Sequence, residues 1–144
     1  MHDGPVTGSG TLDPRESAKF AAMADDSWNP QGKFASLHKM NPIRLEFIRA
    51  EIVRHFDVSP ASRQPLAGLT VLDLGCGGGL VTEPMARLGG KVRGIDAEAE
   101  NIAAARAHAR GVPREIDYRI ALPEALVALN EPPADVVLGL EIVE

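Results

Sequence analysis

The segment VLDLGCGGGL, residues 71–80, combines an acidic residue with a dense set of glycines. Asp73, Gly75, Gly77 and Gly79 follow the spacing D-x-G-x-G-x-G at the end of an apolar stretch. Glycines lack Cβ atoms, so a ligand can lie directly against their main chain. A helix that starts after the loop would offer free N–H groups to a carboxylate. The pattern therefore predicts the floor of a nucleoside-sized binding site.

A second acidic residue, Asp96, ends the next apolar stretch. In nucleotide-binding βαβ units, an acid about twenty residues after the glycine loop takes the ribose hydroxyls. The alternative is that Asp96 only caps the helix that follows it. A ligand with a carboxylate, an ammonium group and a ribose but no phosphate suits these residues together, which predicts S-adenosylmethionine as the cofactor.

Two other nucleotide motifs fit the loop less well. The dinucleotide fingerprint needs a third glycine or an alanine where Leu80 stands, and a P-loop needs a lysine followed by serine or threonine. The single cysteine, Cys76, has no histidine near it in the sequence, so we expect a small filler in the loop and not a nucleophile.

The elements that must position these residues alternate between strand and helix from residue 69 onward. We expect strands over 69–74, 91–96, 116–120 and 135–141, and helices over 78–88, 98–110 and 123–129. Such alternation predicts an α/β fold, a Rossmann-like doubly wound parallel sheet with right-handed crossovers. Pro84 lies within the first of these helices and is compatible only with its opening turn.

The part before the sheet is expected to be helical. Residues 1–15 are interpreted as a flexible tail, and residues 16–68 as N-terminal helices with a lid-like segment. One helix is predicted over 16–23, where the turn residues DDSWNPQG end it. A second is predicted over 42–56, with Asn41 as its N-cap and Pro42 in its first position. Residues 59–68 are interpreted as a linker.

Composition narrows the class of protein. The chain has 144 residues, of which 44% are hydrophobic and 24% are charged, as in a soluble globular domain. The formal net charge of -5, with scattered basic residues, argues against nucleic acid as a partner. A single cysteine and the lack of a signal-peptide pattern favour the cytoplasm. The final apolar stretch stops without a turn, so we expect residues 69–144 to form the first half of a longer domain, truncated after the fourth strand.

Two parts of the sequence resemble known enzymes. The segments VLDLGCGGGL, GID and DVVLGLEIVE resemble class I S-adenosylmethionine-dependent methyltransferases. The tract over residues 20–48 resembles, more specifically, the ubiquinone-biosynthesis O-methyltransferases, and the likeness extends over residues 18–144. The matching positions of the tract are Trp28, Gly32, Phe34, Leu37, His38, Asn41, Pro42, Arg44 and Leu45.

The resemblance implies that the cofactor is held by Arg44, Gly75, Asp96 and Leu140. A guanidinium can bind the cofactor's carboxylate through a charge-assisted hydrogen bond. Without the family pattern, Arg44 would be interpreted as an exposed residue of an amphipathic helix. Leu140 stands where a methionine is expected, and an apolar contact survives that change.

The tract offers further candidates. His38 could serve as an acid or base, or it could be a hydrogen-bonded structural residue. Trp28 and Phe34 could line a pocket for a quinone or phenol ring, or they could simply pack. The other histidines, His108 among them, carry no signal.

A metal site is implied by Glu141 and Glu144. They resemble an E-x-x-E-H motif that is associated with Mg²⁺ or Zn²⁺, and such an ion would lower the pKa of a phenol. The sequence ends before the histidine. The alternative is two acidic residues that close a strand.

The implied activity is S-adenosylmethionine-dependent methylation of ring hydroxyls on polyprenyl phenols or catechols, namely 2-polyprenyl-6-hydroxyphenol and 3-demethylubiquinol. Peripheral contact with the inner face of the membrane and with other quinone-biosynthesis enzymes follows from such substrates. A methyltransferase for another small molecule and a non-catalytic cofactor-binding fragment stay open as alternatives. We also expect residues 1–144 alone to be inactive, and to aggregate or bind cofactor weakly, because the fourth strand would leave an apolar edge unpaired.

Overall fold

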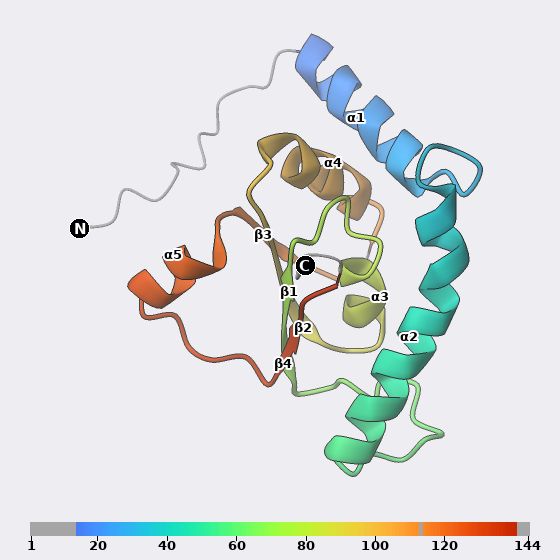
Figure 1. The fold of residues 1–144 in the computed structure, drawn as a ribbon, viewed down its shortest axis with the longest axis vertical. Coiled ribbons are helices and arrows are strands. Elements are labelled where there is room, and N and C mark those ends of the chain that lie inside the picture. Colours follow the sequence, from blue (N-terminus) through green and yellow to red (C-terminus); the bar gives the residue numbers. More distant parts are fainter. Residues whose placement is uncertain (1–13, 113, 141–144) are drawn as a thin grey trace.

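The computed structural model describes residues 14–112 and 114–140. Its four strands form one parallel sheet in the order β3-β2-β1-β4 (Figure 1). The strands are β1 (Thr70–Leu74), β2 (Lys91–Asp96), β3 (Asp117–Ile120) and β4 (Val136–Leu138). The predicted α/β class is therefore confirmed. β4 is shorter than the predicted 135–141, and residue 141 lies outside the described part.

The order of the strands places a crevice at one end of β1. The chain runs outward from β1 to β2 and β3, and then crosses back to pair β4 with the other side of β1. The strand order thus reverses between β1 and β4. In open α/β sheets, ligands bind outside the carboxyl ends of the strands at such a reversal.

The helices cover the two faces of the sheet unequally. In Figure 1, α3 (Thr82–Arg87) and α4 (Ala99–Ala109) lie on one face, and α5 (Pro123–Ala128) lies on the other. We call these the α3 face and the α5 face. The helices α1 (Pro14–Trp28) and α2 (Ala35–His55) lie outside α4 and α3, on the α3 side. Right-handed crossovers explain this arrangement, because the direction of travel reverses after β3.

The first helix differs from its predicted bounds. α1 begins at Pro14, inside the expected tail, and runs to Trp28 instead of ending at residue 23. The residues DDSW complete its last turn, and the break falls at Asn29 to Gly32, where the Gly32 N–H bonds the Asn29 carbonyl at 3.0 Å. The turn residues were recognised, but only those from Asn29 onward end the helix.

The predicted start of the second helix is wrong. α2 begins at Ala35, and Pro42 lies inside it. The helix is started by a turn in which the N–H of Ala35 bonds the carbonyl of Gly32 at 3.0 Å. Pro42 lacks only one N–H group, so a long helix can contain it at a local cost. Asn41 is not an N-cap, because its side chain binds elsewhere, as described below.

The third helix supports the argument about Pro84. α3 begins at Thr82 and not at residue 78, so Pro84 is its third residue and lies in the opening turn. Residues 75–81 form turns in place of helix. The expected condition for this proline is therefore met.

The hydrophobic core lies between the α3 face and the helices on it. Its fully or almost fully buried members include Val71, Val92, Met85, Ile48 and Ile52. Leu66, with no exposed surface, also belongs to this core, although the sequence assigned it to a linker. The end of the predicted linker is therefore anchored to the domain.

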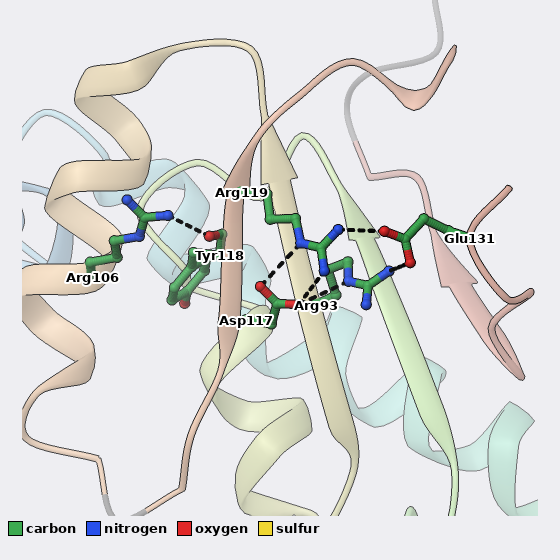
Figure 2. Close-up of polar contacts among 6 residues, drawn as sticks. All are labelled: Arg93, Arg106, Asp117, Tyr118, Arg119 and Glu131. Atoms are coloured by element: carbon green, nitrogen blue, oxygen red, sulfur yellow. Dashed lines mark hydrogen bonds and ion pairs between the residues drawn. The ribbon is translucent and has the colours of Figure 1, made fainter. Parts of the chain in front are cut away.

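The α5 face carries a charged quartet formed by Arg93, Asp117, Arg119 and Glu131. Figure 2 shows the two guanidinium groups between the two carboxylates. The Nε of Arg93 bonds Asp117 at 3.1 Å, and its Nη1 bonds Glu131 at 3.1 Å. Nη1 of Arg119 reaches Glu131 at 2.6 Å. The quartet ties the segment before β4 to β2 and β3. On the opposite face, Arg106 of α4 donates to the Tyr118 carbonyl at 2.6 Å (Figure 2).

A polar clamp sets the register of β4 against β1. The N–H and Oγ1 of Thr70 both donate to Oδ2 of Asp135, at 2.8 and 3.1 Å. The N–H of Asp135 returns a bond to the Thr70 carbonyl at 3.0 Å. These bonds precede the ladder in which Val71 pairs with Val136.

Among the helices of the described residues, none has the length and apolar character that a membrane span requires.

Candidate cofactor-binding site

A cavity of about 210 Å³ lies at the carboxyl end of β1. Five of the six predicted cofactor contacts line it, and Asp96 does not; the five are Arg44, Asp73, Gly75, Gly77 and Leu140. They come from α2, from β1 with its exit loop, and from the segment after β4. The fold therefore gathers residues nearly a hundred positions apart around the crevice that the strand order predicts.

Asp73 supplies a buried carboxyl group to this cavity. Its side chain is only 3% exposed, and Thr82 Oγ1 donates to its Oδ2 at 2.8 Å. Burial raises the pKa of Asp73 to about 6, against the opposing effects of the Thr82 hydrogen bond and the positive charge of Arg44. A cationic ligand group in the cavity would favour the ionised form.

Asp96 is bonded to the main chain of the glycine loop. The Gly77 N–H donates to its Oδ2 at 3.0 Å, and the Glu98 N–H donates to its Oδ1 at 2.8 Å. Asp96 therefore bonds the main chain of Glu98, the residue at the N-cap of α4, but is not itself that N-cap. Its proposed bond to a ribose stays a prediction. Asn101, which the sequence analysis did not select, lines the cavity and approaches Oδ1 of Asp96 at 3.4 Å.

Two glycines of the loop are required by close neighbours. Gly79 has a φ of 93°, and a Cβ there would overlap the Tyr118 hydroxyl. A Cβ at Gly78 would lie 3.1 Å from the Cβ of Ser27, at the end of α1. The loop is therefore packed between Tyr118 of β3 and Ser27 of α1.

The tract over residues 20–48, which includes the end of α1 and the first half of α2, bonds the main-chain carbonyls of the loop and of α1. Trp28 Nε1 donates to the Gly78 carbonyl at 3.0 Å, and Asn41 Nδ2 donates to the Leu80 carbonyl at 2.9 Å. The contact between His38 Nε2 and the Ser27 carbonyl measures 2.8 Å. Because a carbonyl only accepts, Nε2 of His38 carries the proton.

These contacts bear on the roles considered for the side chains of the tract, which stay predictions. His38 and Trp28 are not among the described residues that line the cavity, whereas Phe34 is. His38 has the structural partner that its alternative interpretation required. The indole N–H of Trp28 bonds the carbonyl of Gly78. Asn41 bridges two segments instead of capping a helix.

Cys76 lines the same cavity but is buried. Burial and the charges of Asp73 and Asp96 raise the pKa of its thiol far above the ordinary range. A protonated thiol is a poor nucleophile, which agrees with the interpretation of Cys76 as a filler.

The proposed metal ligands cannot be placed. Glu141 and Glu144 lie outside the described residues. Within residues 14–112 and 114–140, no group of three or more histidine, cysteine or acidic side chains could hold a metal ion.

A family profile and the curated relatives of the chain both indicate a methyltransferase. A profile of the methyltransferase domain family matches residues 71–143. The chain is 52% identical, over 93% of its length, to the ubiquinone biosynthesis O-methyltransferase of Sinorhizobium medicae, and 50% identical over 94% to that of Caulobacter vibrioides. It covers 54% of each of these two proteins. The chain therefore spans about half the length of the curated relatives that it matches.

Solved structures show the same fold. The bifunctional kinase-methyltransferase WbdD has a TM-score of 0.54 and 31% identity, with 69% of this chain and 21% of that chain covered. Magnesium protoporphyrin IX methyltransferase from Synechocystis PCC 6803, crystallised with S-adenosylmethionine, has a TM-score of 0.54 and 20% identity, with 89% and 62% covered. Taken with the parallel sheet and the glycine loop, these matches show that the chain belongs to the methyltransferase domain family.

Proposed function

We propose that the cavity at the end of β1 binds S-adenosylmethionine. The observation that carries this proposal is that a buried acid, Asp73, and a guanidinium, Arg44, line the same cavity as the glycines of the loop. The cofactor has a cationic sulfonium and ammonium, which suit the Asp73 carboxylate, and a carboxylate, which suits Arg44. Asp96 and Asn101 offer an acceptor and an amide at the edge of the same loop, where a ribose would lie.

The reaction proposed for the complete protein is transfer of the cofactor's methyl group to a ring hydroxyl of a polyprenylated phenol or catechol. The names of relatives with 50% and 52% identity support this acceptor class. A phenolate attacks the methyl carbon in line with the carbon–sulfur bond, and the sulfur leaves as a neutral thioether. Opposite charges cancel in this step, so a dry cavity that fixes distance and direction supplies much of the catalysis.

The residues of this chain would act by positioning. Arg44 would orient the amino-acid end of the cofactor, and the loop from Gly75 to Gly79 would bring its sugar against the main chain. The tract fastened by Trp28 and Asn41 would cover the loop and exclude water. A divalent cation stays a proposal that depends on Glu141 and Glu144, and no step is derived through it.

The proposed partners follow from the acceptor. A polyprenyl tail makes the substrate lipid-borne, which favours a cytoplasmic enzyme in peripheral contact with the inner face of the membrane and with other enzymes of quinone biosynthesis. Flotation of the protein with vesicles that contain a polyprenyl phenol, compared with vesicles without it, tests this contact.

Calorimetric titration of the complete protein with S-adenosylmethionine, S-adenosylhomocysteine and NAD tests the cofactor. We expect the two adenosyl ligands to bind and NAD not to bind. Arg44→Leu should weaken binding of S-adenosylmethionine by roughly 10- to 100-fold, since a hydrogen bond to a charged group is lost. Arg49→Leu is the matched control, because Arg49 lies on the same helix but bonds the carbonyls of Pro60 and Ser62. Preference for NAD, or equal effects of the two variants, would refute the proposal.

Transfer of a labelled methyl group tests the acceptor. The complete protein is incubated with labelled S-adenosylmethionine and with a prenylated catechol or the same catechol lacking its tail, each with Mg²⁺, Zn²⁺ or a chelator. Faster labelling of the prenylated catechol supports the assignment. Cofactor binding without labelling of either catechol would restrict the proposal to the cofactor site, and equal rates with metal and with chelator would remove the cation.

A further inference from the structure

A ring of contacts closes around the glycine loop from outside the cavity. It passes from the Gly78 carbonyl to Trp28 Nε1 at 3.0 Å, and from the Trp28 ring to the ring of His108. It then passes from His108 Nδ1 to Glu83 Oε1 at 2.7 Å. The Glu83 N–H donates to the Gly79 carbonyl at 3.0 Å and so returns to the loop.

The stack between Trp28 and His108 is the central contact of this ring. The two ring centroids lie 3.8 Å apart, and the ring planes differ by 3°. Trp28 is the last residue of α1, whereas His108 lies in the last turn of α4. The indole is therefore held on one side by its hydrogen bond to Gly78 and on one face by an imidazole.

Glu83 fixes the orientation of that imidazole. Its side chain has no exposed surface, and its Oε2 has no hydrogen-bond partner among the described residues. The His108 side chain is 29% exposed and forms the side-chain hydrogen bond of this carboxyl group among residues 14–112 and 114–140. The contact between Nδ1 of His108 and Oε1 of Glu83 therefore sets the plane of the imidazole from the domain interior.

We propose that His108 and Glu83 are positioning residues of the cofactor site, which act through Trp28 to hold the α1–α2 segment closed over the glycine loop. The inference rests on the proposed cofactor. The contacts of Trp28 reach the loop at Gly78, directly beside Gly77, which lines the cavity and bonds Asp96. Ordering this loop before the ligand arrives lowers the entropic cost of binding, so loss of the ring of contacts weakens affinity.

Three variants separate this role from packing. His108→Gln keeps a side-chain donor for Glu83 but removes the stacked ring, whereas Glu83→Gln keeps an acceptor for His108 but removes the charge. Ile102→Val is the control, because Ile102 is a fully buried residue of α4 that takes no part in the ring of contacts. Trp28 is the single tryptophan of the chain, so its fluorescence reports the stack directly.

The experiment measures Trp28 emission with and without S-adenosylhomocysteine, the dissociation constant of that ligand, and the thermal midpoint of each variant. A stacked imidazole quenches indole emission, so His108→Gln should brighten the ligand-free chain. Both polar variants should weaken the ligand by roughly 10-fold, a typical coupling between linked sites. Ile102→Val should lower the thermal midpoint at least as much and leave the affinity within about twofold.

Each outcome has a separate meaning. Unchanged emission in His108→Gln would overturn the stack, and affinities that follow the thermal midpoint across all three variants would reduce the ring of contacts to ordinary packing. If the wild-type chain binds neither S-adenosylmethionine nor S-adenosylhomocysteine while emission responds as expected, the proposed function fails, the stack stands, and its role in cofactor binding is overturned.

Discussion

The two faces of the sheet are stabilised by different means. On the α3 face, Val71, Val92 and Met85 form a dry core, and the polar side chains there converge on the glycine loop. On the α5 face, the charged quartet spans β2, β3 and the segment before β4. Apolar side chains on and around α5 and on β4 are left exposed, namely Leu122, Val127, Leu129 and Val137.

The comparison shows that the α3 face both stabilises the fold and supports the site. Burial of apolar surface contributes most of the stability, and solvent-exposed ion pairs contribute little each. The face with the better packing is also the face that supplies the buried acid and the loop supports. Changes on the α3 face should therefore alter stability and cofactor binding together, whereas changes on the α5 face should alter neither by much.

The largest effect is expected from truncating the core. Met85→Ala removes a side chain with no exposed surface and should lower the free energy of unfolding by about 3 kcal/mol. Val127→Ala on α5, where the side chain is 81% exposed, should change it by less than about 0.5 kcal/mol. Urea unfolding followed by circular dichroism measures both. Similar losses in the two variants would remove the contrast between the faces.

A smaller loss of stability is expected from adding a Cβ atom to the loop at Gly79, next to the Tyr118 hydroxyl. Gly79 and Gly68 both have positive φ, at 93° and 83°, but only Gly79 has a neighbour where its Cβ would lie. Gly68→Ala should cost about 1 kcal/mol from the backbone alone. Gly79→Ala should cost roughly 2 to 3 kcal/mol, because the Tyr118 hydroxyl must also move. Equal unfolding free energies in the two variants would show that β3 does not support the loop.

The pH dependence of cofactor binding should distinguish the acids of the two faces. The pKa of Asp73 is raised to about 6 by burial, whereas the pKa of Glu131 is lowered by its hydrogen bond from Arg119. A bound cation favours ionised Asp73, so affinity for S-adenosylmethionine should be full above pH 6. Below pH 6 it should fall by up to about tenfold per pH unit, as the carboxylate is protonated.

Calorimetry between pH 5 and pH 8 measures this dependence. Asp73→Asn should bind more weakly at pH 8 and show a flat profile, whereas Asp117→Asn on the α5 face should keep the wild-type profile. A wild-type affinity that is constant over this range would exclude Asp73 as the group facing the cation.

The smallest effect is expected from breaking the charged quartet. Asp117→Asn removes the carboxylate that bonds both arginines and should cost roughly 0.5 kcal/mol of stability at low salt. The loss should shrink further at high ionic strength, because salt screens exposed charges. The loss in Met85→Ala should not decrease with salt. A large, salt-independent loss in Asp117→Asn would make the quartet part of the core.

Sequence patterns predicted the sheet and the floor of the site but not the path of the tract. Asp73, Gly75 and Gly77 are close together in the sequence, and the strand before them is one continuous apolar stretch. The strand and the glycine loop were therefore predictable. The start of α2 was not, because an Asn-Pro pair is typical of a helix N-terminus. In the structure Asn41 instead bonds Leu80, a partner that lies far along the chain.

The supports of the loop were missed for the same reason. His108 carried no signal, since its partners Glu83 and Trp28 are 25 and 80 positions away in the sequence, and each is an ordinary helix residue. Trp28 and His38 were recognised as candidates for contact with a ring or a proton, with packing and a hydrogen-bonded structural role as the alternatives, but their carbonyl partners were not predicted. Side-chain bonds to main-chain carbonyls leave no mark on the sequence of the accepting residue, so this use of polar side chains could not be foreseen.

The clamp between Thr70 and Asp135 bears on how the protein acquires its site during folding. The sheet's longest pairing in sequence is that of β1 with β4, and the clamp's hydrogen bonds join residues 65 positions apart. Loop closure over such a distance is entropically slow compared with the β1–β2 pairing. Leu140, which follows β4, lines the cavity. A nascent chain that has paired β1, β2 and β3 thus already displays its glycine loop, but it acquires a closed cofactor cavity only when β4 joins in register.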